Sequence, residues 1–225
     1  TSVTIPNSVT SIGNAAFYGC SNLDSVTIPN SVTSIGFAAF RNCTSLTSII
    51  IPNSVTSIGN SAFADCSSLN LITIPNSVTS IESNTFNGCS NLDSVTIPNS
   101  VTTIGRGAFY NCTSLTSIII PNSVIYISLY AFQNCHSLGS VTIPNSVTSI
   151  GIEAFKGCSN LREVISLANT PSSVGLYCFY NIPNDAILKI PCAKSHLYTS
   201  SSWNNYFSNI VEMCDGVDTV IYATI

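Results

Sequence analysis

Hydrophobic and polar positions follow a fixed order that returns every 23 residues along most of the chain. In the unit at residues 23–43, Val26 and Ile28 share one face of a short extended segment, and Ser25 and Thr27 point to the other face. This alternation predicts a short strand at the start of the unit, with its apolar face toward a core.

The second half of the same unit contains a stop signal, a bend and a turn. Pro29 ends the strand because it has no amide hydrogen to donate, and the Asn-Ser pair after it favours a turn. Val32 and Ile35 then begin a second extended segment, and Gly36 frees the backbone for a bend. Residues 38–40 are too few for an ordinary helix and predict a single helical or 3₁₀ turn. Each unit is therefore expected to form one closed coil.

The motif Ile-Pro-Asn-Ser-Val occurs seven times at this interval, and phenylalanine and cysteine recur in the same register. A fixed period of this length is typical of stacked units, each too small to bury a hydrophobic face alone. Stacking would place the strands in parallel along one side of a continuous core. The recurring residues are Pro6, Pro29, Pro52, Pro75, Pro98, Pro121 and Pro144, then Phe17, Phe40, Phe63, Phe86, Phe109, Phe132 and Phe155, then Cys20, Cys43, Cys66, Cys89, Cys112, Cys135 and Cys158.

The rhythm loosens after Cys158, where one inserted residue puts Phe179 24 residues after Phe155. We therefore predict a solenoid at residues 1–191, with seven regular coils, one degenerate coil and a final strand that ends at Pro191. Cys178 falls on the usual alanine position of the coil, so we expect it to be buried.

Residues 192–225 are predicted to form a C-terminal cap, because the last coil of a solenoid leaves its core open. Trp203, Phe207 and Ile210 recur at the spacing of one face of a short helix. Trp203 would then cover the core, and the alternative is a ring that stacks on a ligand. At the other end the chain starts inside a repeat, and we expect the protein to continue upstream of Thr1.

The seven cysteines at one repeat position are expected to stack as reduced, buried thiols, because free cysteine packs as a small hydrophobic residue. A zinc site is disfavoured, since the spacing brings no four ligands together. Outside this row, only Cys192 and Cys214 are free to form a disulfide with each other.

The composition excludes several classes of protein. With 7% charged and 45% hydrophobic residues, the chain is not of the disordered type. A net charge of −4 gives no basic surface for nucleic acid, and no apolar run is long enough to span a membrane. His136 and His196 have no carboxylate and nucleophile near them in the repeat, so we predict neither catalytic residues nor a cofactor or metal.

The pattern C-x-x-L-x-x-V-x-I-P-x-x-V-x-x-I-G-x-x-A-F resembles the BspA-like (treponemal-type) leucine-rich repeats, over roughly residues 1–191. The tail, with Tyr198, Trp203 and Phe207, resembles the closing segment of such proteins from Bacteroides-like gut bacteria. The resemblance implies a leucine-rich-repeat right-handed superhelix with a parallel β-sheet on its concave face. Members of this family are typically secreted or attached to the cell surface and are implicated in adhesion to host proteins or other cells.

In leucine-rich repeats the concave face is commonly the binding surface, and here it would present small polar side chains with a few apolar ones. Threonine also favours strands, so these rows have a purely structural explanation as well. A second candidate is the variable position after the glycine, where Phe37, Leu129 and Ile152 are expected to be exposed. The concave-face candidates are Ser25, Thr27, Ser48, Ile50, Leu71, Thr73, Ser94, Thr96, Ser117, Ile119, Ser140 and Thr142.

Two functional hypotheses follow. The first is a non-enzymatic, monomeric, extracellular or cell-surface module that presents an extended repeat surface to a protein or glycan of a host or neighbouring cell. The alternative is a rigid stalk that displays another domain.

Overall fold

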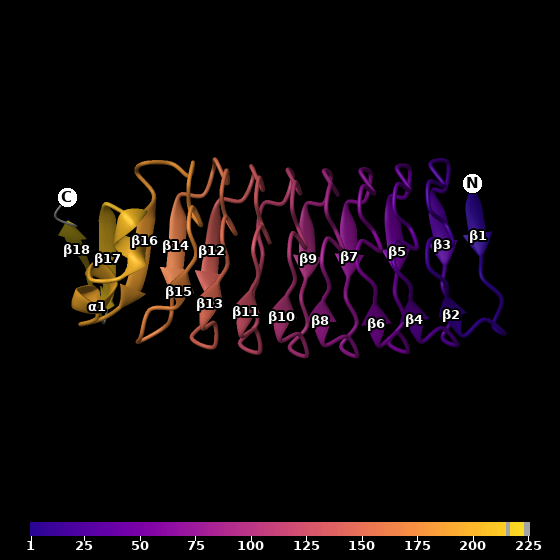
Figure 1. Cartoon of the computed structure of the whole chain (residues 1–225), viewed down its shortest axis with the longest axis horizontal. Helices are drawn as coiled ribbons and strands as arrows, with labels where there is room; N and C mark the ends of the chain where they lie inside the picture. The colour runs from indigo at the N-terminus through magenta and orange to yellow at the C-terminus, as the bar shows by residue number, and fades with distance from the viewer. Residues whose placement is uncertain (215–216, 223–225) are drawn as a thin grey trace.

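The computed structural model describes residues 1–214 and 217–222 of the chain. It is a parallel-strand β-solenoid of about nine turns with about 23 residues in each coil, and almost no helix. Figure 1 shows the coils standing side by side along the long axis, with the chain ends at opposite ends of the stack. The repeat-solenoid fold predicted from the period is confirmed.

The first sheet takes one strand from almost every coil, and neighbouring strands pair in parallel. The register joins equivalent residues, so that Val3 lies beside Val26, because the coil length is constant. The coil at residues 115–120 contributes only single bridges, from Ile119 to Thr96 and to Thr142. The strands are β1 (Ser2–Thr4), β3 (Ser25–Thr27), β5 (Ser48–Ile50), β7 (Leu71–Thr73), β9 (Ser94–Thr96), β12 (Ser140–Ile143), β14 (Glu163–Ser166) and β16 (Ile187–Pro191).

A second row of two-residue strands follows the Ile-Pro-Asn-Ser-Val turn in the seven regular coils and takes the same place in the degenerate coil. These strands pair in parallel in two groups, the first three and the last five. The serine of that motif links coils: the Ser54 hydroxyl donates to the Val32 carbonyl at 2.7 Å, and the Ser100 hydroxyl donates to the Val78 carbonyl at 2.6 Å. The strands are β2 (Ser11–Ile12), β4 (Ser34–Ile35), β6 (Ser57–Ile58), β8 (Ser80–Ile81), β10 (Thr103–Ile104), β11 (Tyr126–Ile127), β13 (Ser149–Ile150) and β15 (Ser173–Val174).

The third side of each coil, which we call the turn strip, corrects the helical turn predicted at residues 38–40. Ala38 and Asn42 have left-handed backbone angles, with φ of 51° and 61°, and a right-handed helical turn cannot contain them. The strip is instead a series of tight turns whose alternate amides bond to the next coil, as from Phe40 to the Ala62 carbonyl at 2.8 Å. The turn strip comprises residues 13–20, 36–43, 59–66, 82–89, 105–112, 128–135, 151–158 and 175–182.

The second left-handed position of the strip is occupied in every coil by Gly, Asn or Asp. These residues adopt a positive φ at the lowest cost. The residues are Gly19, Asn42, Asp65, Gly88, Asn111, Asn134, Gly157 and Asn181.

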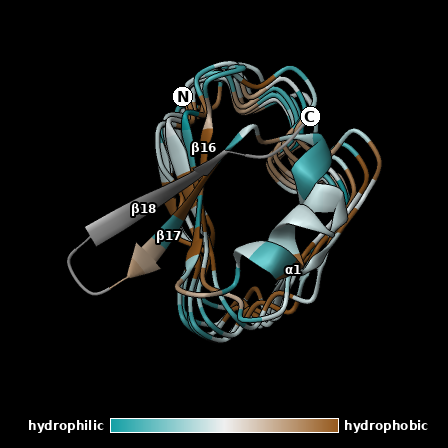
Figure 2. Cartoon of the chain, turned by 90° about the vertical axis from the view of Figure 1, so that its left-hand side faces the viewer, coloured by the Kyte–Doolittle hydropathy of each residue, from teal (hydrophilic) through white to brown (hydrophobic). Residues whose placement is uncertain are grey.

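The core is a column of phenylalanine rings that begins at Phe17 and ends at Phe179. Consecutive rings are stacked, with centroids 5.0 Å apart between Phe17 and Phe40 and 5.7 Å apart between Phe63 and Phe86. From Phe40 to Phe155 these rings are fully buried. Viewed along the stack in Figure 2, the coils superpose as one closed outline around this core.

The cysteine row is buried from Cys43 to Cys158, as expected, but Cys20 is exposed. Each of the six buried thiols donates to a phenylalanine carbonyl 26 residues earlier, as from Cys66 to Phe40 at 3.1 Å. Cys20 belongs to the first coil, so no earlier coil in this chain covers it. The predicted row of seven buried thiols is therefore wrong at its first member. Cys178 is buried, as expected.

The C-terminal segment differs from the predicted helix face. It contains α1 (Ser195–Thr199), the 3₁₀ turn Ser202–Asn205, β17 (Asn209–Cys214) and β18 (Val217–Tyr222). Trp203, Phe207 and Ile210 are buried, but they come from the 3₁₀ turn, a connecting loop and a strand. The run of β-branched residues at 210–211 favours a strand over a helix.

The parallel sheet also does not end at Pro191, because β17 pairs with β16 in parallel and β18 pairs with β17 in antiparallel. In Figure 2, β16 and β17 lie on one side of the coil outline and α1 on the other. Residues 215–216 and 223–225 of the predicted cap lie outside the described residues.

Trp203 is held inside the molecule and not presented to solvent. Its indole N–H donates to the Ser172 carbonyl at 2.9 Å, and its ring centroid lies 5.4 Å from that of Phe179. The neighbouring Tyr198 donates to the Ala168 carbonyl at 2.7 Å. Because Trp203 is fully buried, it covers the core and is not available to stack on a ligand.

Candidate binding surfaces

The twelve candidate residues of the sheet face point outward from the first sheet, as their alternation with buried positions requires. Ser94 and Thr142 are half-buried and the other ten are exposed. The register forms rows across the strands: Ser48 lies beside Leu71, and Ile50 lies beside Thr27 and Thr73.

Two isoleucines dominate this face. Ile50 is 84% exposed and Ile119 is 80% exposed, each at a position that is threonine in most coils. Leu71, which is 55% exposed, lies on β7, the strand next to Ile50. The face is therefore neutral, with apolar side chains set among hydroxyl groups.

The variable positions of the turn strip form a second surface. Phe37 and Ile152 are exposed, as expected, but Leu129 is half-buried. Next to Leu129, the Tyr130 amide donates to the Ile152 carbonyl at 3.0 Å and joins this coil to the following one. Arg106 lies over the Tyr130 ring, with 5.6 Å between the guanidinium carbon and the ring centroid.

This second surface changes along the stack. The last coils carry large exposed side chains, of which Leu176 is 63% exposed, Tyr177 48% and Tyr180 51%. Sequence reasoning missed this cluster, because it depends on which turn residues face outward.

The hydrogen bonds found at the two histidines are structural. His136 is exposed, with Nδ1 2.8 Å from the Gly157 carbonyl oxygen, so it closes a turn between neighbouring coils. His196 is exposed on α1.

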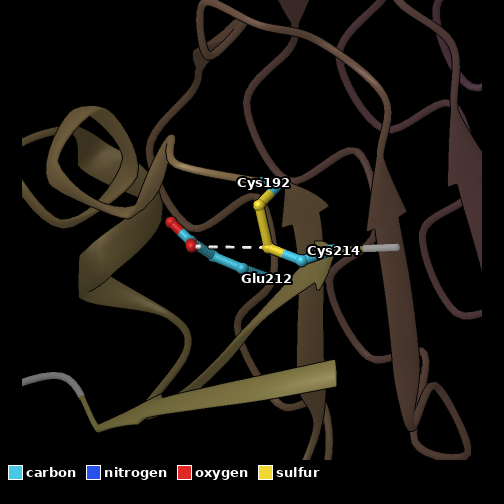
Figure 3. A group of neighbouring side chains, drawn as sticks. All are labelled: Cys192, Glu212 and Cys214. Atoms are coloured by element: carbon cyan, nitrogen blue, oxygen red, sulfur yellow. Dashed lines mark hydrogen bonds between the residues drawn. A yellow bond between two sulfur atoms is a disulfide. The ribbon is translucent and has the colours of Figure 1, made fainter. Parts of the chain in front are cut away.

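Within the described part of the chain, only Cys192, Glu212 and Cys214 bring three potential metal ligands together (Figure 3). The two sulfur atoms are joined in a disulfide, with Cα atoms 4.9 Å apart, so neither is a thiolate ligand. This pair is the one that the sequence left free to form a disulfide.

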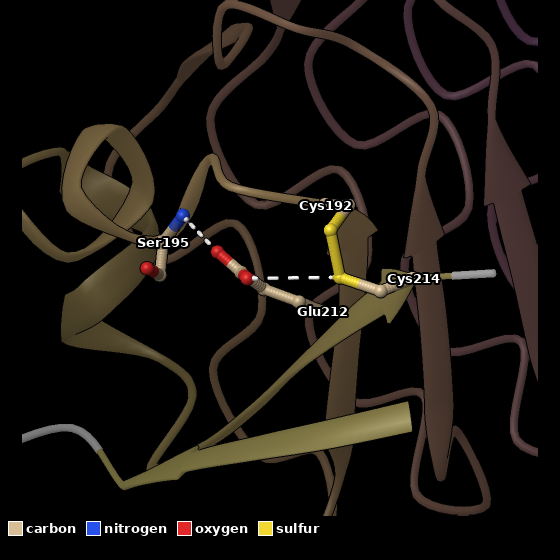
Figure 4. The surroundings of a disulfide bond; sticks show 4 residues. All are labelled: Cys192, Ser195, Glu212 and Cys214. Carbon is tan, nitrogen blue, oxygen red and sulfur yellow. Dashed lines mark hydrogen bonds between the residues drawn. A yellow bond between two sulfur atoms is a disulfide. The ribbon is translucent and has the colours of Figure 1, made fainter. Parts of the chain in front are cut away.

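The Glu212 carboxylate accepts a hydrogen bond from the main chain at the start of α1 (Figure 4). The donor is the Ser195 amide, at 2.7 Å. Burial alone would raise the pKa of Glu212, but amide donors at Ser195, Ala193 and Lys194 outweigh it and lower the pKa. Glu212 therefore links β17 to the start of α1, and the disulfide links β17 to Cys192, the residue that follows β16.

Comparison with known proteins settles the family. The sequence model of the family described as BspA type leucine rich repeat region (6 copies) matches residues 1–112 and 79–211. The chain belongs to the BspA-type leucine-rich repeat family.

Solved structures of similar proteins come from several bacteria. A leucine-rich repeat protein from Bacteroides ovatus is 29% identical, with a TM-score of 0.67 over 84% of this chain and 55% of that one. One from Eubacterium ventriosum is 34% identical, with a TM-score of 0.66 over 70% and 42%. A leucine rich cell surface protein from Faecalibacterium prausnitzii is 30% identical, with a TM-score of 0.52 over 96% and 63%.

This BspA-type chain thus spans less than two thirds of the length of each of these three proteins. A search of curated proteins found no match. Among the described residues, every helix is too short to cross a membrane.

Proposed function

We propose that this BspA-type domain is a non-enzymatic binding module of the bacterial cell surface or exterior, which adheres as a monomer to a protein or glycan of a host or neighbouring cell. The sheet face carries the proposal: Ile50, Leu71 and Ile119 are exposed at positions that the repeat otherwise fills with serine or threonine. Exposed apolar side chains grouped on one face are typical of an interaction site.

The relatives support the surface location. The Faecalibacterium prausnitzii protein is described as a cell surface protein, and it is 30% identical to this chain. The fold adds stiffness, because hydrogen bonds between neighbouring coils continue along the whole stack. Stiffness also suits the alternative function of a stalk that displays another domain.

Binding to immobilised extracellular-matrix proteins and to a glycan array tests the proposal. The double variant Ile50→Thr, Ile119→Thr restores the usual residue of the repeat, so it should fold normally and bind at least ~10-fold more weakly if these side chains make the contact. The matched control is Ile125→Thr, which is the same substitution at a residue 38% exposed on another side of the coil.

Each outcome separates the hypotheses. Equal binding by the double variant and the control would remove the sheet face as the contact surface. If the intact chain binds no protein and no glycan, the result would contradict adhesion, and the stalk would be the remaining hypothesis.

We also propose that residues 192–225 act as the cap of the solenoid at residues 1–191. Trp203 and Phe207 pack on the last ring of the core, with centroids 5.4 and 5.1 Å from that of Phe179. Deletion of residues 192–225 should expose this core and cause aggregation or end-to-end association. A truncated chain that stays monodisperse with unchanged melting would contradict the cap.

A further inference from the structure

A hollow of about 740 Å³ lies at the C-terminal end of the turn strip, between the last coil and residues 204–208. Four of the eleven residues that line it are asparagines: Asn181, Asn184, Asn204 and Asn205. None of the described residues that line it carries a charge. The volume falls within the range of small-molecule sites, which is ~300–1,000 Å³.

Some hydrogen-bonding groups at this hollow have no partner among the residues that the structure describes. The Oδ1 atom of Asn204 is buried and accepts no hydrogen bond in the part of the chain that the structure describes. Buried polar atoms are nearly always paired in folded proteins. Because this oxygen has almost no accessible surface, it shows that hydrogen bonding in the wall is incomplete, and the exposed polar groups of the hollow are the ones that a ligand would meet.

Two main-chain amides add donors at the same place. In the coil before, Phe155 donates to the Cys178 carbonyl at 2.9 Å and Gly157 donates to the Tyr180 carbonyl at 2.8 Å. The equivalent amides of the last coil belong to Phe179 and Asn181, which line the hollow and make no main-chain hydrogen bond with any described residue. At the end of the turn strip these two amides therefore have no carbonyl of a following coil to donate to.

Aromatic rings form one rim of the hollow. Tyr180 lines it with half of its surface exposed and meets Tyr177 edge to face, with ring centroids 5.7 Å apart. Tyr177 has a left-handed φ of 57°, like Tyr130 at the same position of an earlier coil, whose φ is 61°.

We propose that this hollow binds a short neutral oligosaccharide, an inference that rests on the proposed adhesive function and names the class of its ligand. Sugar hydroxyls both donate and accept hydrogen bonds, and so does each Asn side chain. The flat C–H face of a sugar ring stacks on an exposed tyrosine such as Tyr180. A lining without charge selects against sialylated or sulfated sugars, because burying their charge without a partner is costly.

A peptide fits the hollow less well. An extended peptide needs a row of main-chain donors and acceptors to pair with. Here none of the eleven lining residues belongs to a strand, and four of them are asparagines.

The test uses the intact chain on an array of neutral, sialylated and sulfated oligosaccharides, followed by calorimetric titration with the neutral sugar that binds best. Tyr180→Ala should weaken that binding at least ~10-fold. The matched control is Tyr18→Ala: Tyr18 occupies the same coil position and is also 51% exposed, but it lies at the opposite end of the stack. Asn184→Asp is a second variant, which keeps the size of an exposed rim residue, removes its N–H donors and adds a charge.

The expected result is neutral-sugar binding that Tyr180→Ala and Asn184→Asp both weaken and Tyr18→Ala leaves unchanged, with urea melts alike in all variants. Binding only to charged sugars, or equal loss in Tyr180→Ala and Tyr18→Ala, would overturn the site. So would sugar binding that only the Ile50→Thr, Ile119→Thr variant removes, although adhesion would then stand. Displacement of the sugar by unrelated peptides would also overturn the carbohydrate assignment. Binding to matrix proteins without any sugar would overturn this inference alone, and no binding at all would refute both proposals.

Discussion

The Cys89 thiol donates a hydrogen bond of 3.1 Å to the main-chain carbonyl of Phe63 in the preceding coil. The same oxygen accepts the Cys66 amide at 3.3 Å, so the thiol fills its second acceptor site. Cysteine therefore contributes both buried volume and a link between coils, which alanine at this position would not provide.

Cys89→Ala should reduce the free energy of unfolding by about 1–2 kcal/mol, because it removes this hydrogen bond and leaves a small void. Urea denaturation followed by circular dichroism measures the loss. Cys20→Ala is the control and should change stability by less than ~0.5 kcal/mol, because Cys20 is exposed. Equal effects of the two substitutions would contradict the role of the thiol bond.

Thiol labelling should distinguish one reactive cysteine from seven protected ones. The structure has eight free cysteines, of which only Cys20 is exposed. A water-soluble maleimide should therefore modify Cys20 alone in the folded protein and all eight thiols in denaturant. Rapid native labelling of further cysteines would show that the coils open or that the row is not buried.

Stability should fall at alkaline pH. Burial, with the nearby Cys20 thiol, raises the pKa of Cys43 from 9.0 to about 11, and burial raises that of Cys158 to about 12. A pKa raised in the folded state favours folding fully below the unfolded value, and this advantage is lost as pH rises through the folded values. Urea midpoints should thus hold steady up to about pH 9 and decline between about pH 9 and 12. A midpoint that stays constant to pH 11 would contradict this.

The serine hydrogen bond between coils can be tested by comparing two serines of the motif, one with a hydrogen-bond partner and one without. Ser100 donates to the Val78 carbonyl at 2.6 Å, whereas the buried hydroxyl of Ser146 in the same motif has no partner among the described residues. Ser100→Ala should cost about 0.5–1.5 kcal/mol, and Ser146→Ala should be neutral or slightly stabilising. The two melts, compared under the same conditions, decide whether the hydroxyl or only its volume matters.

Phe86→Ala should cost about 3–5 kcal/mol, because it opens a cavity between the stacked rings of Phe63 and Phe109. Phe37→Ala should cost less than ~1 kcal/mol, because half of that side chain is in solvent. A comparable loss from both would mean that the inner and outer positions of the coil are assigned wrongly.

The inner and outer positions could be read from the sequence because burial repeats with the coil. A single unit predicts that Val26 and Ile28 are buried and that Phe40 points inward, and all three are buried. The exposure of Ile50 and Ile119 follows from the same alternation. Periodicity is thus a sufficient guide wherever a neighbouring coil has the same shape.

The turn strip could not be predicted by the same reasoning. Its shape depends on two left-handed residues per coil, and the first of these positions accepts Ala38, Ser61 and even Tyr130. Only the second position carries a readable signal, in its restriction to Gly, Asn or Asp. The hollow at Asn204 could not be predicted either, because it lies between the turn strip and residues 204–208, which are not part of the repeat.

The C-terminal segment shows where spacing misleads. Trp203, Phe207 and Ile210 fit a helical period, yet they are buried from three different local structures. A terminal coil has no identical neighbour to fix its backbone, so burial there follows the shape of the open core and not a period.

The residue-for-residue register between coils also determines how this protein can change in length. Each coil bonds only to its two neighbours, so recombination between near-identical repeats can add or remove a whole 23-residue unit without altering any other contact. A single inserted residue, such as the one before Phe179, must instead be absorbed in a loop. Each unit gained or lost would shift the last coil and its hollow by ~4.8 Å along the stack. The number of repeat units in the chain therefore determines the length of the molecule.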